Sequence, residues 1–260
     1  MKPGHHPNLS NADYHAADGI SSSNLKLLYE SELHLKHKEL FWSESDAFNF
    51  GSLVHCLALE PDNFANEFIV MPKLDGRTNA GKADKAAWME SATGKMLVTD
   101  EDIQRASRMV KNVQTIAGNL LSHGVKEQSY FAMDGDLLIK CRPDNYIQSA
   151  GIVVDLKTIS SRNGREMSDW DIKRAVKDYR YDWSAVWYPK VLNLLGLPAK
   201  KFVFVFVDTA SPHNVRIREL PYAVLEAAFS DIEMMLDKYR AFLATGKANV
   251  IKELFYYNEE

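Results

Sequence analysis

An acid and a lysine stand two residues apart near the end of the segment CRPDNYIQSAGIVVDLKT, residues 141–158. The β-branched run at 152–154 follows a Ser-Ala-Gly turn and predicts a strand that continues through Asp155 and Lys157. Side chains alternate between the faces of a strand, so Asp155 and Lys157 point the same way while Leu156 points into the core. Two charged groups at the end of a buried strand are costly to desolvate. The pair therefore needs a functional explanation.

A second carboxylate, Asp144, precedes this strand and directly follows Pro143. If the strand that ends at Arg142 pairs with the strand of Asp155 as a hairpin, both carboxylates reach one point. Two carboxylates with a few waters suit a hard cation such as Mg²⁺ or Mn²⁺. Lys157 could then orient or deprotonate a water, or stabilise charge on a phosphoryl group. On spacing alone the alternative stays open, with Asp144 as a turn residue and Asp155 and Lys157 as a surface ion pair.

Composition excludes several classes of site. The chain has 260 residues and a net charge of 31 − 35 = −4, so a site for a polyanion must be a local patch. Only Cys56 and Cys141 occur, which excludes a four-thiolate zinc or iron–sulfur site and suggests no disulfide framework. No signal peptide or run of 18 apolar residues is visible, so we expect a cytoplasmic protein without membrane contact.

Apolar periodicity indicates which elements position these residues. Helices are predicted from the serines at 21–23 through Leu33, over 51–59, from Thr99 through Leu120, and over 221–245. Strands are predicted at 67–71, 128–133, 137–142, 152–158, 201–207 and 215–220. Residues 201–207 are apolar on both faces, as in a central strand, and 215–220 alternate, as at an edge. We expect a single α/β domain over 1–260 with a mixed central sheet flanked by helices, and a flexible or loosely ordered arm over 1–18.

Pro-Asp, a gap and Asp-x-Lys together resemble the PD-(D/E)xK nuclease superfamily. More specifically, the chain resembles the C-terminal nuclease domain of the exonuclease VIII (RecE) family from about Tyr14 to about Val207. The segments that carry this resemblance are YHA, GIS, FGSLVHCLALEPDNFANEFIV, RTNAGK, CRPD, DLKT and DYRYD. It implies a restriction-endonuclease-like core in which Asp144, Asp155 and Lys157 are catalytic.

The resemblance also implies a set of metal ligands. The motif HCLALEP places a metal-site histidine at His55, beside Asp144 and Asp155, with the backbone carbonyl of Leu156 as a further ligand. Glu127 stands where related exonucleases carry an additional acid, although a glutamate before a strand is usually just solvated. The expected cofactor is Mg²⁺, for which Mn²⁺ could substitute, without ATP.

One motif of the family is incomplete in this chain. Related enzymes carry a Gln-x-x-x-Tyr helix after the lysine strand, and the corresponding residues here are Ser184 and Tyr188. The glutamine is absent, and Pro189 argues against a regular helix. We expect a DNA contact from Tyr188 and assign no role to Ser184.

A locally basic stretch runs from Lys157 to Arg180, with Trp170, Tyr179, Tyr181 and Trp183 interleaved. Basic and aromatic side chains together are typical of surfaces that follow a nucleic-acid strand, although a solvated amphipathic segment is the alternative for each single residue. The expected DNA-binding residues are Arg77, Lys82, Arg142, Arg162, Arg165, Lys173, Arg174 and Tyr188.

The segment GRTNAGKA, residues 76–83, leaves a competing interpretation. It fits the phosphate-binding pattern G-x-x-x-x-G-K, but Ala83 stands where the pattern needs a hydroxyl for Mg²⁺. No second nucleotide motif accompanies it. A P-loop-type phosphohydrolase is therefore the weaker alternative.

The resemblance implies a metal-dependent exodeoxyribonuclease that degrades linear double-stranded DNA from its ends. Digestion would run 5′-to-3′ and leave 3′ single strands for recombination with a single-strand annealing protein. Individual phosphate contacts are weak and salt-sensitive, so we also expect a ring-like homo-oligomer around the DNA. A catalytically inactive DNA-binding relative is the other alternative.

Overall fold

The computed structural model describes residues 1–40, 46–72, 78–79, 81–83, 88, 92, 94–162 and 165–246. The strands are β1 (Gly4–His6), β2 (Phe68–Val70), β3 (Met96–Val98), β4 (Val125–Lys126), β5 (Ser129–Asp134), β6 (Leu137–Cys141), β7 (Asn145–Ile147), β8 (Ile152–Ile159), β9 (Lys201–Asp208) and β10 (Val215–Arg218). The helices are α1 (Asn11–Ala16), α2 (Ser22–Glu30), α3 (Glu32–Lys36), α4 (Asp46–Leu59), α5 (Phe64–Glu67), α7 (Asp100–Leu121), α8 (Asp169–Asp178), α9 (Tyr181–Leu194) and α10 (Tyr222–Thr245), with 3-10 turns η1 (Lys38–Leu40) and η2 (Pro61–Asn63).

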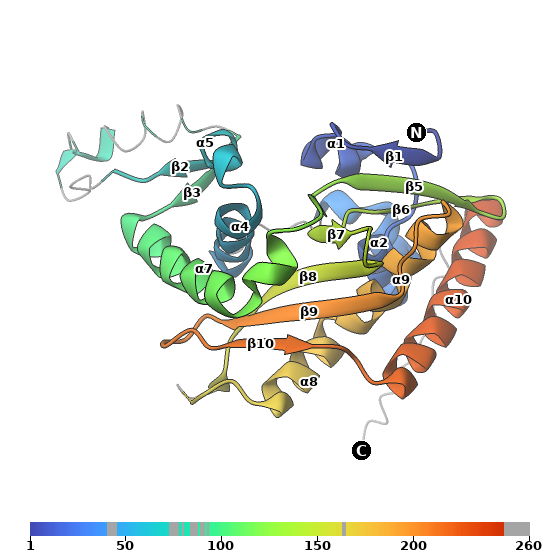
Figure 1. Ribbon diagram of the computed structural model, residues 1–260. Helices are drawn as coiled ribbons and strands as arrows, with labels where there is room; N and C mark the ends of the chain where they lie inside the picture. Colours follow the sequence, from blue (N-terminus) through green and yellow to red (C-terminus); the bar gives the residue numbers. More distant parts are fainter. Residues whose placement is uncertain are drawn as a thin grey trace, which may run out of the picture.

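A mixed five-stranded sheet in the order β10-β9-β8-β7-β4 forms the centre of the described chain. β8 pairs with β9 in parallel and with β7 in antiparallel, and β10 is an antiparallel edge strand. Figure 1 shows α4 and α7 on one side of β8 and β9, and α8, α9 and α10 on the other. The expected α/β class, a mixed sheet flanked by helices, is confirmed.

Two apolar layers bury the faces of the sheet. Phe204 and Phe206 of β9 pack with α2, α8, α9 and α10, whereas Val205 and Val207 pack with α4 and α7. The side chains of β8 also point into these two layers, and that of Leu156 lies in the layer with α4 and α7. The predicted burial of Leu156 between Asp155 and Lys157 is therefore confirmed.

Side-chain hydrogen bonds cap the amino-terminal ends of two helices, α2 and α7. Ser21 caps α2 by accepting a hydrogen bond from the Asn24 backbone N–H, and Thr99 caps α7 in a capping box with Asp102. These starts agree with the predicted ones. Leu33 differs, because it lies in the separate helix α3 and is exposed.

The amino-terminal segment is more ordered than the arm that we predict over 1–18. β1 pairs with β5 in antiparallel, and Tyr14 of α1 is buried. The buried Lys140 on β6 donates to the carbonyl oxygens of Tyr14 at 2.7 Å and Ala17 at 2.6 Å. A polar segment can be anchored in this way because its backbone carbonyl groups, and not its side chains, accept the hydrogen bonds of the buried Lys140 ammonium.

The prediction that Pro189 disrupts regular structure is wrong, because α9 continues through it from Tyr181 to Leu194. A proline within a helix costs about 3 kcal/mol. The same helix buries Trp183, Trp187, Val191 and Leu192 completely. Each such side chain contributes about 1.5–3 kcal/mol, so burial outweighs the cost of the proline.

No helix among the described residues combines the length and the apolar character that a membrane span needs.

Candidate active site

The hairpin of β7 and β8 places Asp144 beside the middle of β8. The hairpin partner of β8 is β7, rather than the strand that ends at Arg142, since β6 belongs to a separate sheet with β1 and β5. Pairing stops at Asn145↔Val154, so the Leu156 N–H has no strand partner on that side and donates to Asp144 Oδ2 at 2.6 Å. The Leu156 carbonyl oxygen points to the same side of β8 as the Leu156 N–H, toward Asp144.

Asn145 fixes the position of Asp144 against the end of α7. Its Nδ2 donates to the carbonyl oxygens of Leu120 at 2.7 Å and His123 at 2.6 Å, which satisfies backbone groups left open where a helix ends. Gly124 permits the chain that follows α7 to pass close to β7. Its φ is +99°, and a Cβ there would lie 2.6 Å from the Tyr146 carbonyl oxygen. Sequence reasoning assigned no role to Asn145, and its position directly after Asp144 was the available signal.

His55 on α4 and Glu127 after β4 complete a group with Asp144. One ligand atom from each of these side chains lies within 4.8 Å of the others, and His55 Nδ1 is 3.4 Å from Asp144 Oδ2. Burial and the charge of Lys157 lower the pKa of His55 to about 4, so its imidazole is neutral at neutral pH and offers a lone pair. Burial and Asp144 raise the pKa of Glu127 well above its ordinary value, against the effect of Arg142.

The buried Asp155 and the half-buried Lys157 form an ion pair in which one carboxylate oxygen stays unsatisfied. The Lys157 ammonium donates to Asp155 Oδ1. Asp155 Oδ2 is buried and has no hydrogen-bond partner among the residues that the structure describes. Burial raises the pKa of Asp155 to about 6; Lys157 opposes this shift and Asp144 adds to it. Burial alone would lower the pKa of Lys157, but Asp155 and Asp144 raise it above the ordinary lysine value.

These donors fit a hard divalent cation. Buried carboxylates with raised pKa values and an oxygen without a partner are stabilised by a cation that accepts oxygen and imidazole ligands. The side chains of Asp144, Asp155, His55 and Glu127, together with the Leu156 carbonyl, are the groups that would hold it. The structure places His55, Glu127 and Asp144 within ligand distance of one another, and the assignment of the whole set as metal ligands stays a prediction.

Arg142 lies inside this group and is not free to contact DNA as predicted. Its guanidinium donates to Glu127 Oε2 at 3.2 Å, to the Leu9 carbonyl oxygen at 2.9 Å and to Ser129 Oγ at 2.9 Å. These contacts hold Glu127, whose φ of 49° is unusual for a residue with a side chain, next to Asp144. Arg142 therefore positions the candidate ligand Glu127.

A second lysine that sequence reasoning missed lies beside Lys157. The Nζ atoms of Lys26 on α2 and of Lys157 lie 5.6 Å and 5.3 Å from the centroid of the Tyr181 ring on α9. Burial and the charge of Lys157 lower the pKa of Lys26 to about 8. Lys26 stands between two leucines of an amphipathic helix, a pattern that gives no signal of a site.

The two residues that correspond to the incomplete family motif lie on α9. Burial raises the pKa of Tyr188 well above its ordinary value, and the charges of Asp155 and Asp144 contribute. Ser184 is buried. A DNA contact by Tyr188 stays a prediction.

Most of the remaining predicted DNA-binding residues lie on exposed segments. Arg162, Arg165 and Lys173 are exposed and Arg174 is half-buried, at the end of β8 and on α8. Lys82 is exposed in a short helical stretch, and Arg77 lies outside the described residues. The P-loop-like segment 76–83 also lies partly outside them.

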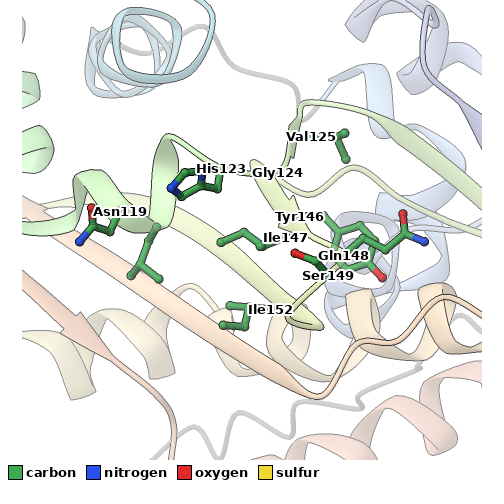
Figure 2. A pocket seen from close by; sticks show the side chains of 10 residues that line it. Asn119, His123, Gly124, Val125, Tyr146, Ile147, Gln148, Ser149 and Ile152 are labelled. Carbon is green, nitrogen blue, oxygen red and sulfur yellow. The ribbon is translucent and has the colours of Figure 1, made fainter.

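A hollow of about 660 Å³ opens at the other end of β7, as Figure 2 shows. Its lining includes Asn119 of α7, His123 just after α7, Ile147 of β7, and Gln148 and Ser149 from the β7–β8 turn. None of its lining residues carries a carboxylate or a thiol. The hollow therefore lacks the ligand chemistry of the Asp144–Asp155 site.

Comparison with known proteins gives one family and two solved structures. A family model described as "PDDEXK-like domain of unknown function (DUF3799)" matches residues 21–251. A crystal structure described as "Putative exonuclease" from Eubacterium rectale is 15% identical, with a TM-score of 0.63 over 93% of this chain and 89% of that chain. A phage-related exonuclease from Haemophilus somnus 129PT is 11% identical, with a TM-score of 0.35 over 76% of this chain and 95% of that chain. No curated protein matches. The family match and the Eubacterium rectale structure confirm the predicted restriction-endonuclease-like core.

Proposed function

Because the chain belongs to the PDDEXK-like domain family, we propose that it is a divalent-metal-dependent nuclease that degrades linear double-stranded DNA from its ends. The observation that carries this proposal is the buried pair Asp144 and Asp155, with one unsatisfied oxygen, next to the Lys157 ammonium. A carboxylate pair can hold a divalent cation, and a neighbouring ammonium can stabilise the charge that develops during phosphodiester hydrolysis.

The residues divide the chemistry among them. A divalent cation supplies Lewis-acid chemistry, which lowers the pKa of a water and neutralises charge on the phosphodiester. Asp144, Asp155 and His55 would hold this cation, with the Leu156 carbonyl and Glu127 as further ligands. Lys157, fixed by Asp155, would hold the attacking water in line with the scissile bond or donate to a phosphate oxygen.

The finer parts of the proposal rest on the resemblance to exonuclease VIII nucleases. They are Mg²⁺ as the working metal, 5′-to-3′ polarity, and 3′ single strands passed to an annealing partner. A net charge of −4 gives the monomer little general attraction for DNA. A ring-like homo-oligomer would supply the hold on the duplex that individual phosphate contacts lack.

A digestion of matched linear and closed-circular DNA tests this function. With Mg²⁺ alone, we expect the wild-type chain to degrade a plasmid that has been cut once and to spare the covalently closed form of the same plasmid. EDTA should stop the reaction, and ATP should not change its rate. End-labelling of either strand gives the polarity.

Each other outcome assigns the chain to another class. Closed circles cut as fast as linear DNA would make it an endonuclease. A requirement for ATP would favour the P-loop alternative, and binding without degradation would favour a catalytically inactive relative. Light scattering on the same sample gives the molecular mass and so tests the ring-like homo-oligomer. The mass of a monomer would contradict it.

A further inference from the structure

One face of α8 combines basic side chains with an exposed tryptophan. Trp170, Lys173, Arg174 and Lys177 are spaced i, i+3, i+4 and i+7, which places them on the same side of the helix. The opposite side, which includes Ile172, Ala175 and Val176, is buried in the core. Trp170 is nevertheless 53% exposed, so an apolar ring of large area stays in contact with water.

Two arginines flank the Trp170 ring. The guanidinium carbons of Arg162 and Arg174 lie 4.7 Å and 5.3 Å from the ring centroid, within the range of a cation–π interaction. Arg174 also donates to the Ser160 carbonyl oxygen at 3.4 Å, which ties it to the end of β8. The ring is thus held on the surface by charged neighbours and not by burial.

Two carboxylates of this stretch are paired with arginines of another strand, whereas Asp178 is exposed. Glu166 pairs with Arg216 at 3.0 Å and Asp169 pairs with Arg218 at 2.7 Å, both arginines belonging to β10. Among the residues that the structure describes, no ion pair is recorded for Arg162, Lys173 or Lys177. The α8 face therefore carries net positive charge, although the whole chain is acidic.

Two stacked aromatic rings lie between the end of α8 and Lys157 of the candidate active site. Tyr179, at the end of α8, is 61% exposed and stacks on Tyr181 with centroids 5.5 Å apart and an interplanar angle of 26°. The Tyr181 ring in turn lies 5.3 Å from Lys157 Nζ. Trp183, by contrast, is fully buried and cannot contact a ligand.

We propose that the α8 face, defined by Arg162, Trp170, Lys173, Arg174 and Lys177, binds an unpaired DNA strand that continues past Tyr179 at the end of the helix. Bases of such a strand stack on the exposed aromatic rings while its phosphates contact the basic side chains. A duplex fits less well, because its base faces are covered by their own neighbours and leave nothing for the rings to stack on. The proposal rests on the proposed function in one respect, since digestion at Lys157 is what releases this strand.

The dimensions of the face match a short stretch of strand. Residues 170 to 177 span about 10 Å at roughly 1.5 Å per residue of helix. At about 3.4 Å per stacked nucleotide, this length accommodates about three nucleotides. The face is therefore large enough to guide a strand but too short to retain one alone.

Equilibrium binding in EDTA, where no turnover occurs, tests the proposal. The probes are a fluorescein-labelled oligothymidylate of about 20 nucleotides and a labelled blunt duplex of the same length. Trp170→Ala should weaken oligothymidylate binding roughly tenfold and change duplex binding by less than about twofold, whereas Trp170→Phe keeps most of the affinity. The double variant Lys173→Gln/Lys177→Gln should reduce the slope of log affinity against log salt by about 1.4.

The matched control is Tyr222→Ala, which removes an exposed ring on α10 and should leave both affinities unchanged. Unchanged oligothymidylate binding by Trp170→Ala with an unchanged melting temperature would overturn the proposal. Equal losses for oligothymidylate and duplex would also overturn it, because the face would then bind duplex DNA. Since binding is measured without turnover, a chain that binds through Trp170 but digests no DNA refutes the nuclease and leaves this inference standing.

Discussion

Asp155→Asn should lower the rate of DNA degradation by on the order of a hundredfold to a thousandfold while the fold stays intact. The amide has nearly the same shape as the carboxylate and retains an oxygen for the Lys157 ammonium. It replaces the second oxygen, which is buried without a partner, by an NH₂ group that cannot bind a cation. Single-turnover digestion of an end-labelled duplex at saturating Mg²⁺ measures the effect.

Asp208→Asn is the matched control. Asp208 is also buried, on the neighbouring strand β9, and its Oδ1 accepts hydrogen bonds from the backbone N–H groups of Ser161 and Ala210. An asparagine can retain that oxygen, so we expect activity within a few-fold of wild type. Near wild-type turnover by Asp155→Asn would refute the assignment of Asp155 as a ligand.

Lys157→Ala should lose on the order of a hundredfold in rate and still bind the metal. The side chain lost is an ammonium that donates to Asp155 and is influenced by the charge of Asp144, and it is not itself a ligand. Removal of a positive charge beside the carboxylates does not weaken their attraction for a cation. Digestion rates and calorimetric titration with Mn²⁺ separate the two effects.

Lys26→Met is the control for a lysine that is near but not paired with Asp155. Its Nζ lies over the same Tyr181 ring as that of Lys157, yet no hydrogen bond to a carboxylate is recorded for it among the described residues. We expect a smaller loss of rate than for Lys157→Ala. If Lys157→Ala lost metal binding together with activity, Lys157 would instead have a structural role.

Sequence patterns predicted the elements whose residues repeat locally. β9 is apolar on both faces, α7 and α10 carry long apolar stripes, and Thr99 provides a cap, so each was identified within one or two residues of its observed start. The metal-ligand set was proposed by resemblance and stays a prediction, while the β7–β8 hairpin places Asp144 beside the strand of Asp155. Local periodicity was sufficient for these helices and strands.

Features that depend on contacts distant in sequence were missed. β1 has three residues without any apolar period, and its order comes from pairing with β5 about 125 residues later. The internal role of Arg142 depends on Glu127 and Leu9, which no pattern links to it. The helix through Pro189 was misjudged because tertiary burial of its tryptophans outweighs a local penalty.

The location of a bound metal tests the account most directly. Crystals of the wild-type chain grown with Mn²⁺ would reveal the ion by its anomalous scattering. We predict a peak about 2.0–2.2 Å from Asp155 Oδ2 and from the Asp144 carboxylate, with His55 as a further ligand. A protein that binds Mn²⁺ at other residues, or leaves this carboxylate pair without an ion at saturating Mn²⁺, would contradict the account.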